Sequence, residues 1–276
     1  KEINQAELKS KLPVAHLVLN TGNGNILSSI LAKNGIKFKT ANIDVKSSPV
    51  EGLNGGAIID SLVYKDYTID SLNLVLNSQD NKLKYNLALL NDAQNSYPYK
   101  GYIDGTFYEK GILANVKILD TSERTAIDLG LRAAMHGEGI MSSITTQQSI
   151  LGYKKFDVND ANYVYIGKDR RISANVKLLA TDGAGAEIYT DDEDSTSLQN
   201  ITLGMHNFEL GKLMTVLPFA PNISGTLNGD YHVIQTKDEL TVASDMSVKN
   251  MIYDDCPMGN VGTNFVYIPK GDGTHY

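Results

Sequence analysis

Side chains that commonly carry out chemistry occur in this chain, but their spacing does not assemble a catalytic site. The five histidines are isolated from one another in the sequence, and none shows the His-x-x-x-His spacing of a metal site. Ser142 and Ser143 lack the Gly-x-Ser-x-Gly elbow of a hydrolase nucleophile, and both are predicted to lie in a strand. These residues therefore predict a protein that is not an enzyme.

The acidic residues follow the chemistry of turns. Asp157, Asp160, Asp169 and Asp182 each lie within two positions of an Asn or a Gly, which is typical of turns rather than of paired catalytic carboxylates. The acidic run 191–194 lacks the alternating oxygen ligands and the Gly turn of a calcium loop, so it is interpreted as a solvated hairpin loop. No metal and no cofactor are predicted.

Charge and composition narrow the class of protein further. The 276 residues carry a formal net charge of −7 and no cluster of Lys and Arg, which argues against a nucleic-acid partner. A single cysteine, Cys256, excludes an intrachain disulfide. It lies in the sequence Asp-Asp-Cys-Pro, which predicts a turn with a half-buried thiol.

Apolar residues recur at every second position in long stretches between about residues 57 and 267. This is the period of a β-strand, in which successive side chains point to opposite faces of the sheet. Short polar links such as 78–81 join neighbouring stretches and indicate an antiparallel meander. The apolar phase of each strand predicts one face, whose candidate binding residues are Leu72, Leu74, Leu76, Leu83, Tyr85, Leu87, Leu89, Ile112, Val116, Ile172, Val176, Leu178, Leu240 and Val242.

Little helix is available to cover that face. A helix is predicted at 25–33, with an apolar stripe that should pack against an end of the sheet, and weaker ones at 2–12 and 209–216. We therefore predict an all-β fold with a helical segment over residues 1–35 and a single elongated antiparallel β domain over residues 36–276. The pattern alone leaves open whether the meander forms a sandwich, a closed barrel or a sheet curled into a groove.

Three segments are familiar when taken together. SPVEGLNGG at 48–56, ILGYKKFDVN at 150–159 and LPFAPNISGTLNGD at 217–230 occur in this order between alternating strands. In this arrangement the chain resembles the periplasmic β region of the TamB proteins, the translocation and assembly module, within the AsmA-like group. The resemblance covers roughly residues 20 to 270.

The resemblance implies a sheet curled lengthwise into a taco-shaped groove lined with apolar side chains. It further implies a periplasmic location, an inner-membrane anchor in a segment outside this chain, and an outer-membrane assembly protein of the Omp85 type as partner. Phospholipid acyl chains would occupy the groove on their way between the two membranes. The family has no catalytic residues to carry over.

Two alternatives remain beside this expectation. A scaffold or chaperone would pair its exposed sheet edge with strands of outer-membrane proteins during their assembly. A secreted carbohydrate-binding sandwich would present exposed aromatic platforms, and the absence of Trp argues against it. For any single apolar residue, the core of a β-sandwich is the simpler role.

Overall fold

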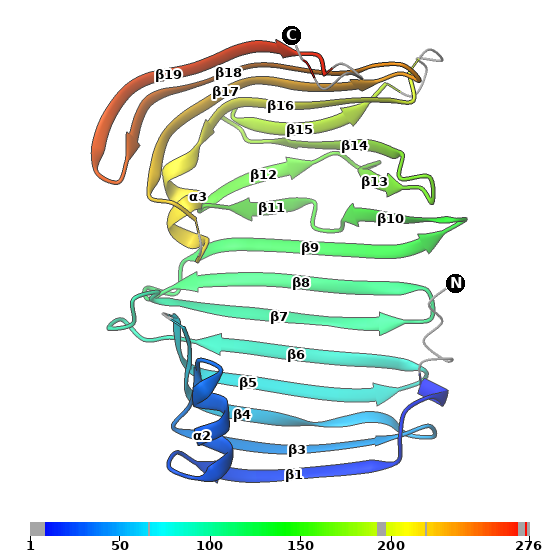
Figure 1. The fold of residues 1–276 in the computed structure, drawn as a ribbon, viewed down its shortest axis with the longest axis vertical. Helices are drawn as coiled ribbons and strands as arrows, with labels where there is room; N and C mark the ends of the chain where they lie inside the picture. Colours follow the sequence, from blue (N-terminus) through cyan, green and yellow to red (C-terminus); the bar gives the residue numbers. More distant parts are fainter. Residues whose placement is uncertain (1–8, 66, 192–196, 219, 270–273, 275–276) are drawn as a thin grey trace. The chain divides into compact units, whose positions relative to one another are not determined.

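A computed structural model describes residues 9–65, 67–191, 197–218, 220–269 and 274 of the chain. The chain forms two compact units, Lys1–Met135 and His136–Tyr276. Both consist mainly of antiparallel strands joined by short links, as Figure 1 shows for each unit. The prediction of an all-β antiparallel meander is confirmed. The predicted single domain over 36–276 spans parts of both units and stays a prediction.

The first unit, called unit 1 below, is a meander in which each long strand pairs with the next one along the chain. Its strands lie side by side in one layer (Figure 1). Its elements are β1 (Ala15–Gly22), α2 (Ile26–Lys33), β2 (Ile36–Lys37), β3 (Thr40–Ser48), β4 (Gly52–Tyr64), β5 (Tyr67–Gln79), β6 (Lys82–Leu90), β7 (Tyr99–Tyr108), β8 (Gly111–Asp120) and β9 (Thr125–His136).

Tight turns fix the register of these hairpins. Asp80 and Asn81, with φ of 50° and 55°, connect β5 to β6 and adopt the left-handed conformation that a two-residue hairpin turn requires. Asp and Asn tolerate this conformation better than other side chains do. The strands predicted at 67–79, 82–90 and 99–108 have the predicted bounds.

The N-terminal region differs from its prediction as a helical segment. Residues 1–8, which hold most of the predicted helix at 2–12, lie outside the described residues. Within 1–35, Ala15–Gly22 is strand β1, paired over its full length with β3. The alternation of Leu17 and Leu19 is the signal of this strand, and it lies too close to a turn and a helix to stand out in the sequence.

Helix α2 forms where the sequence predicts it. The Asn25 side chain accepts a hydrogen bond from the Ser28 amide, and the Ser28 hydroxyl accepts one from the Asn25 amide, which is a capping box. Gly35 follows with φ of 78°. The expected packing of the apolar stripe is wrong, because Ile26 and Ile30 are 80% and 53% exposed.

The second unit, called unit 2 below, also pairs its strands antiparallel, with β14 bonded to both β12 and β13. Its elements are β10 (Gly139–Ile144), β11 (Gln148–Leu151), β12 (Lys154–Val158), β13 (Tyr163–Ile166), β14 (Ile172–Leu179), β15 (Gly185–Thr190), β16 (Gln199–Glu209), α3 (Leu210–Val216), β17 (Ile223–Gln235), β18 (Leu240–Tyr253) and β19 (Cys256–Tyr267).

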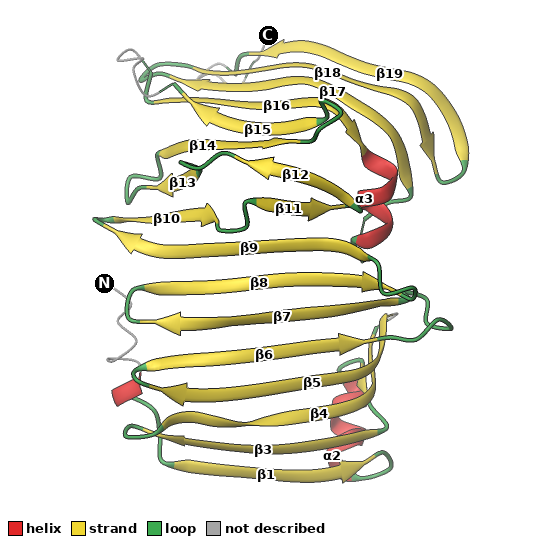
Figure 2. Ribbon diagram, turned by 180° about the vertical axis from the view of Figure 1, so that it is seen from behind, coloured by secondary structure: helices red, strands yellow, loops and turns green. Residues whose placement is uncertain are grey.

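Helix α3 closes a small core in unit 2, and Figure 2 shows it beside the ends of β11 and β12. Phe156 and Phe208 stack with ring centroids 5.8 Å apart and form a buried cluster with Leu210 of the helix. Gly152, with φ of 58°, lets the β11–β12 turn approach α3, because a Cβ there would lie 2.8 Å from the Leu213 nitrogen. Val216 is completely buried.

Candidate apolar binding face

The register of unit 1 aligns one apolar residue from each of its eight long strands in a single row. The row crosses the whole unit because directly opposed residues of paired strands lie on the same face. It consists of Leu19, Ile43, Ala57, Leu74, Leu87, Ile103, Val116 and Leu129. We call the face that carries this row the apolar face of unit 1.

The opposite face of the same strands has a different character. The adjacent row on that side contains Asn20, Asn42, Ile58, Asn73, Ala88, Tyr102, Lys117 and Asp128. Polar and charged side chains are interspersed there with apolar ones. The chain therefore concentrates its apolar side chains on one face of unit 1.

All nine candidate residues of unit 1 lie on this apolar face. The register pairs Leu72 with Leu89, Leu74 with Leu87 and Leu76 with Tyr85. Leu83 and Ile112 share the face because both lie opposite Phe107. Val116 shares it because it lies four residues after Ile112 in the same strand, and every second residue of a strand points to the same face. The sequence missed further members on β1, β3, β4, β7 and β9, although the same alternation marks them.

The exposure of this face bears on the choice between a packed core and an open surface. Every residue of the eight-residue row is partly exposed, and none is buried. In a β-sandwich, the side chains of such a row meet a second sheet and lose almost all contact with solvent. Within the described residues of unit 1, the buried apolar side chains are Phe38, Ala41, Ala126 and Ile127, near one end of the strands.

Tyr85 lies flat on the apolar face. Its hydroxyl donates a hydrogen bond to the Leu113 carbonyl oxygen at 3.1 Å, so the side chain crosses β7 at Gly105. A Cβ at Gly105 would come within 2.5 Å of the Tyr85 hydroxyl oxygen, so this glycine makes room for the ring. Burial, followed by the nearby Asp104 carboxylate, raises the pKa of Tyr85 above its ordinary value.

The five candidates of unit 2 also share one face, but part of that face is covered. Val176 lies in a row with Ile188, Leu203 and Tyr231, and Val242 lies in a neighbouring row. Leu178 packs against the cluster under α3 and belongs to that small core. The remaining candidates, Ile172, Val176, Leu240 and Val242, are partly or largely exposed.

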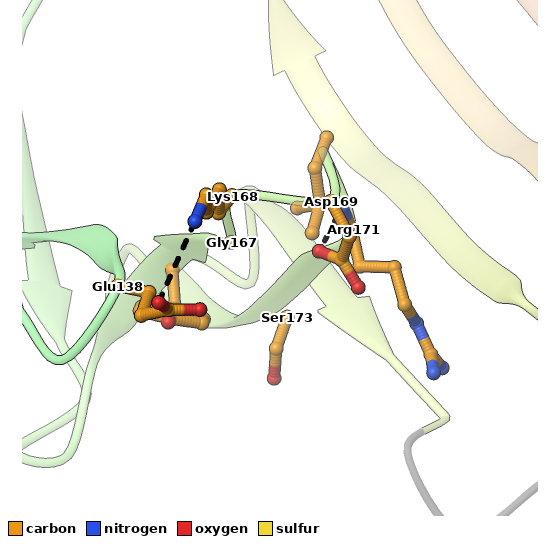
Figure 3. Close-up of a pocket in the computed structure, with 8 residues that line it drawn as sticks. Glu138, Gly167, Lys168, Asp169, Arg171 and Ser173 are labelled. Carbon is orange, nitrogen blue, oxygen red and sulfur yellow. Dashed lines mark hydrogen bonds and ion pairs between the residues drawn. The ribbon is translucent and has the colours of Figure 1, made fainter.

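Unit 2 also contains a pocket of about 700 Å³ with a mixed polar and apolar lining, shown in Figure 3. The Lys168 ammonium lies 3.6 Å from the Glu138 carboxylate, and the Asp169 side chain accepts a hydrogen bond from the Arg171 amide at 3.0 Å. Both members of the Lys168–Glu138 pair are at least three-quarters exposed. An exposed ion pair of this kind is a feature of a solvated surface.

The polar residues that the sequence analysis considered for catalysis lie in strands and in turns. Ser142 and Ser143 lie in β10, as predicted, and Asp169 and Asp182 accept hydrogen bonds from amides two residues later in turns. Asp157 was wrongly assigned to a turn and lies in β12, opposite Gln148. Residues 192–196, with most of the acidic run, lie outside the described residues.

Neither a metal-binding cluster nor a membrane-spanning helix occurs in the described residues. His, Cys, Asp and Glu side chains nowhere gather there in groups of three that could hold a metal ion. No helix in that part of the chain is long and apolar enough to cross a membrane.

Cys256 is exposed at the start of β19, so the prediction of a half-buried thiol in a turn is wrong. The turn consists of Asp254 and Asp255.

Comparison with known proteins identifies no relative of this chain. The chain matches no model of a known protein family, no curated protein and no solved structure. The resemblance to the TamB proteins therefore stays a prediction from the sequence.

Proposed function

We propose that this chain is a non-enzymatic protein of the cell envelope whose apolar face binds phospholipid acyl chains and conducts them between the inner and outer membranes. The observation that carries the proposal is the row of eight apolar side chains in unit 1, all partly exposed. Contiguous apolar surface of this kind on a folded protein is usually a binding site.

The dimensions of the row fit an acyl chain. Neighbouring strands lie about 4.8 Å apart, so a row across eight strands extends for roughly 34 Å. One leaflet of a bilayer contributes about 15 Å of hydrocarbon, half of the ~30 Å core. A single acyl chain is therefore shorter than the row and can lie along it in more than one place.

The energetics favour both binding and movement. Burial of a methylene group contributes about 0.8 kcal/mol when it is complete, and roughly half of that on an open face. Such contacts are non-directional, so no single strand holds the tail more firmly than its neighbours. A tail that has entered the row can therefore slide from strand to strand. This is the mechanism we propose for lipid passage, in a periplasmic protein that contacts an outer-membrane assembly partner.

A charge placed on the row tests the proposal. Leu74→Asp puts a carboxylate at the centre of the row, and Val75→Asp puts one on the opposite face of the same strand, where Val75 is 54% exposed. We expect a fluorescent long-chain fatty acid to bind roughly tenfold more weakly to the Leu74→Asp variant. The Val75→Asp variant should bind it as the unmodified protein does.

Two controls make the titration decisive. Circular dichroism should show the same strand content for both variants, because both side chains are partly exposed and neither belongs to a buried core. Equal affinity of all three proteins would overturn the proposal, as would the absence of saturable binding to the unmodified protein. Mass spectrometry of protein purified from membranes, with and without Leu74→Asp, gives an independent measure of bound phospholipid.

One observation favours the second function, a scaffold that pairs its sheet edge with strands of client proteins. All residues of β19 are exposed, and the strand is twelve residues long. A long exposed edge strand can accept another strand through its main chain. Crosslinks from β19 to client strands, with acyl-chain binding absent, would support this function over the first.

A further inference from the structure

Helix α2, which Figures 1 and 2 show at the end of β1, presents apolar side chains to solvent. Ile26 and Ile30 are 80% and 53% exposed, and the helix has no buried residue. At about 100° per residue, these two side chains and Lys33 lie within about 60° of one another and form one stripe. Leu31 and Ala32, on the other side of the helix, are only partly exposed. A surface helix normally presents polar side chains to solvent, so the amphipathic character of α2 is inverted.

Exposed lysines lie at both ends of this stripe. Lys33 ends it in the last turn of the helix. The Lys65 amide donates a hydrogen bond to the Gly35 carbonyl oxygen at 3.1 Å, which holds the β4–β5 turn against the C-terminal end of α2. The Lys39 carbonyl oxygen accepts one from the Asn23 amide at 3.1 Å, just before the helix begins. The exposed lysines of this region are Lys33, Lys37, Lys39 and Lys65.

The positive charge of these lysines is not balanced by ion pairs. None of the four forms an ion pair with another described residue. Residues 8–43 include no Asp or Glu, although the chain has 32 of them. The Asp60 carboxylate on β4 accepts a hydrogen bond from the Thr40 hydroxyl at 2.6 Å, and Asp66 lies outside the described residues. The described surface around α2 is therefore basic.

An aromatic side chain lies beside the C-terminal end of the helix. Tyr64 is 49% exposed, and it pairs with Ile36 of β2, the strand that follows α2. The Lys65 ammonium lies 5.3 Å from the centre of the Tyr64 ring. Tyrosine is enriched at membrane–water interfaces because its ring is apolar and its hydroxyl is polar. Exposed apolar residues on a helix, lysines and a tyrosine together are typical of a helix that lies in the surface of a membrane.

We propose that α2 docks unit 1 on the surface of a bilayer that contains anionic phospholipids. Ile26 and Ile30 enter the boundary between the headgroups and the acyl chains, and the lysines contact phosphate groups. The charge favours this partner over a second copy of the chain, because two copies that met through α2 would bring like charges together. Docking goes beyond acyl-chain binding and does not require it, since the eight-residue row lies on the strands.

Vesicle flotation of the full chain tests the proposal. We expect binding to vesicles of equal parts phosphatidylcholine and phosphatidylglycerol, and much weaker binding to phosphatidylcholine alone or in high salt. The Ile26→Gln/Ile30→Gln variant keeps good helix formers in α2 and should bind the mixed vesicles roughly tenfold more weakly. The matched control is Val50→Gln/Val75→Gln, because these side chains are 82% and 54% exposed elsewhere in unit 1. It should bind as the unmodified chain does.

The charge contribution has its own variant. Lys33→Gln/Lys65→Gln leaves the apolar stripe in place and removes two of the four ammonium groups. We expect it to bind the mixed vesicles severalfold more weakly, with a smaller salt dependence than the unmodified chain.

A fluorescent reporter gives a second measurement. The chain contains no Trp, so Ile26→Trp introduces a single one into the stripe. Its emission should shift to shorter wavelength when mixed vesicles are added, because the indole leaves water for the membrane interface. Val50→Trp, at a similarly exposed position outside α2, should show no shift.

Several results would overturn the proposal. Among them are failure of the unmodified chain to bind mixed vesicles, equal binding by Ile26→Gln/Ile30→Gln, and an unchanged Ile26→Trp emission. A dimer in light scattering that Ile26→Gln/Ile30→Gln converts to a monomer would assign the helix to a second copy instead. Loss of vesicle binding in Leu74→Asp would assign the membrane contact to the row. Fatty-acid binding should be unchanged in Ile26→Gln/Ile30→Gln, which keeps the tests of the two sites separate.

Discussion

Units 1 and 2 share antiparallel strands and an alternating apolar pattern, but they treat the apolar face differently. In unit 2, α3 covers one end of the face and creates a buried cluster around Phe156 and Phe208. In unit 1, α2 has no buried residue, and the eight-residue row is left partly exposed. The same strand pattern can therefore serve as a core or as a surface, and in unit 2 a packed helix makes part of the face a core.

Truncation of Phe156, which lies in the buried cluster beside α3, should have the largest effect on the free energy of unfolding. Phe156 is 2% exposed and stacks on Phe208. Phe156→Ala leaves a cavity that the surrounding strands cannot fill, and we expect the free energy of unfolding to fall by about 3–5 kcal/mol. Urea denaturation monitored by circular dichroism measures this change. A loss no greater than that of a surface substitution would show that α3 does not form a core.

The corresponding truncation in unit 1, at Leu87, should lower the free energy of unfolding much less. Leu87 lies at the centre of the eight-residue row and is partly exposed. Leu87→Ala removes apolar surface that is only partly buried, so we expect a loss of about 1 kcal/mol. The same denaturation experiment compares it with Phe156→Ala. A loss as large as that of Phe156→Ala would indicate that the apolar face of unit 1 is covered in solution.

A smaller, pH-dependent effect is expected where unit 1 does bury a polar group. In the β6–β7 connection, Asn91 is 6% exposed and donates a hydrogen bond to the Tyr97 carbonyl oxygen. Burial, with a contribution from Tyr99, raises the pKa of Tyr97 to about 12 from the ordinary value of 10.0. The neutral phenol is thus favoured in the folded state.

The sign of the pH dependence follows from proton binding. Between pH 10 and 12 the unfolded chain loses the Tyr97 proton while the folded chain keeps it, so the free energy of unfolding falls as the pH rises. Below pH 10 the contribution is fully present. Denaturation at a series of alkaline pH values should reveal the fall, and Tyr97→Phe should reduce it. An unchanged profile in Tyr97→Phe would contradict the assignment.

Alternation predicted most of the strands because it is a local property of the sequence. Strands β5, β6 and β7 have the predicted bounds, and the nine candidates of unit 1 share the predicted face. The row itself requires the register of every hairpin, and a shift by one residue would move Leu74 to the other face. Sequence patterns do not specify that register across eight strands, so the row emerges only from the structure.

The helices show the limit of the same reasoning. Capping residues correctly placed α2, because a cap acts within one turn. The apolar stripe of α2 did not predict burial, since Ile26 and Ile30 are largely exposed, whereas the shorter α3 buries Leu210 and Val216. Docking depends on how closely strand turns such as Gly152 approach the helix, and that is a tertiary property.

Each strand of unit 1 contributes one residue to the row, and each contacts mainly its immediate neighbours. A hairpin of the same alternation inserted at the β5–β6 turn would lengthen the row by two residues and leave the other strand pairings in place. Growth of this kind needs no redesign of a shared core. The length of the apolar track is therefore a variable that gene duplication of single hairpins can adjust, as the thickness of a sandwich core is not.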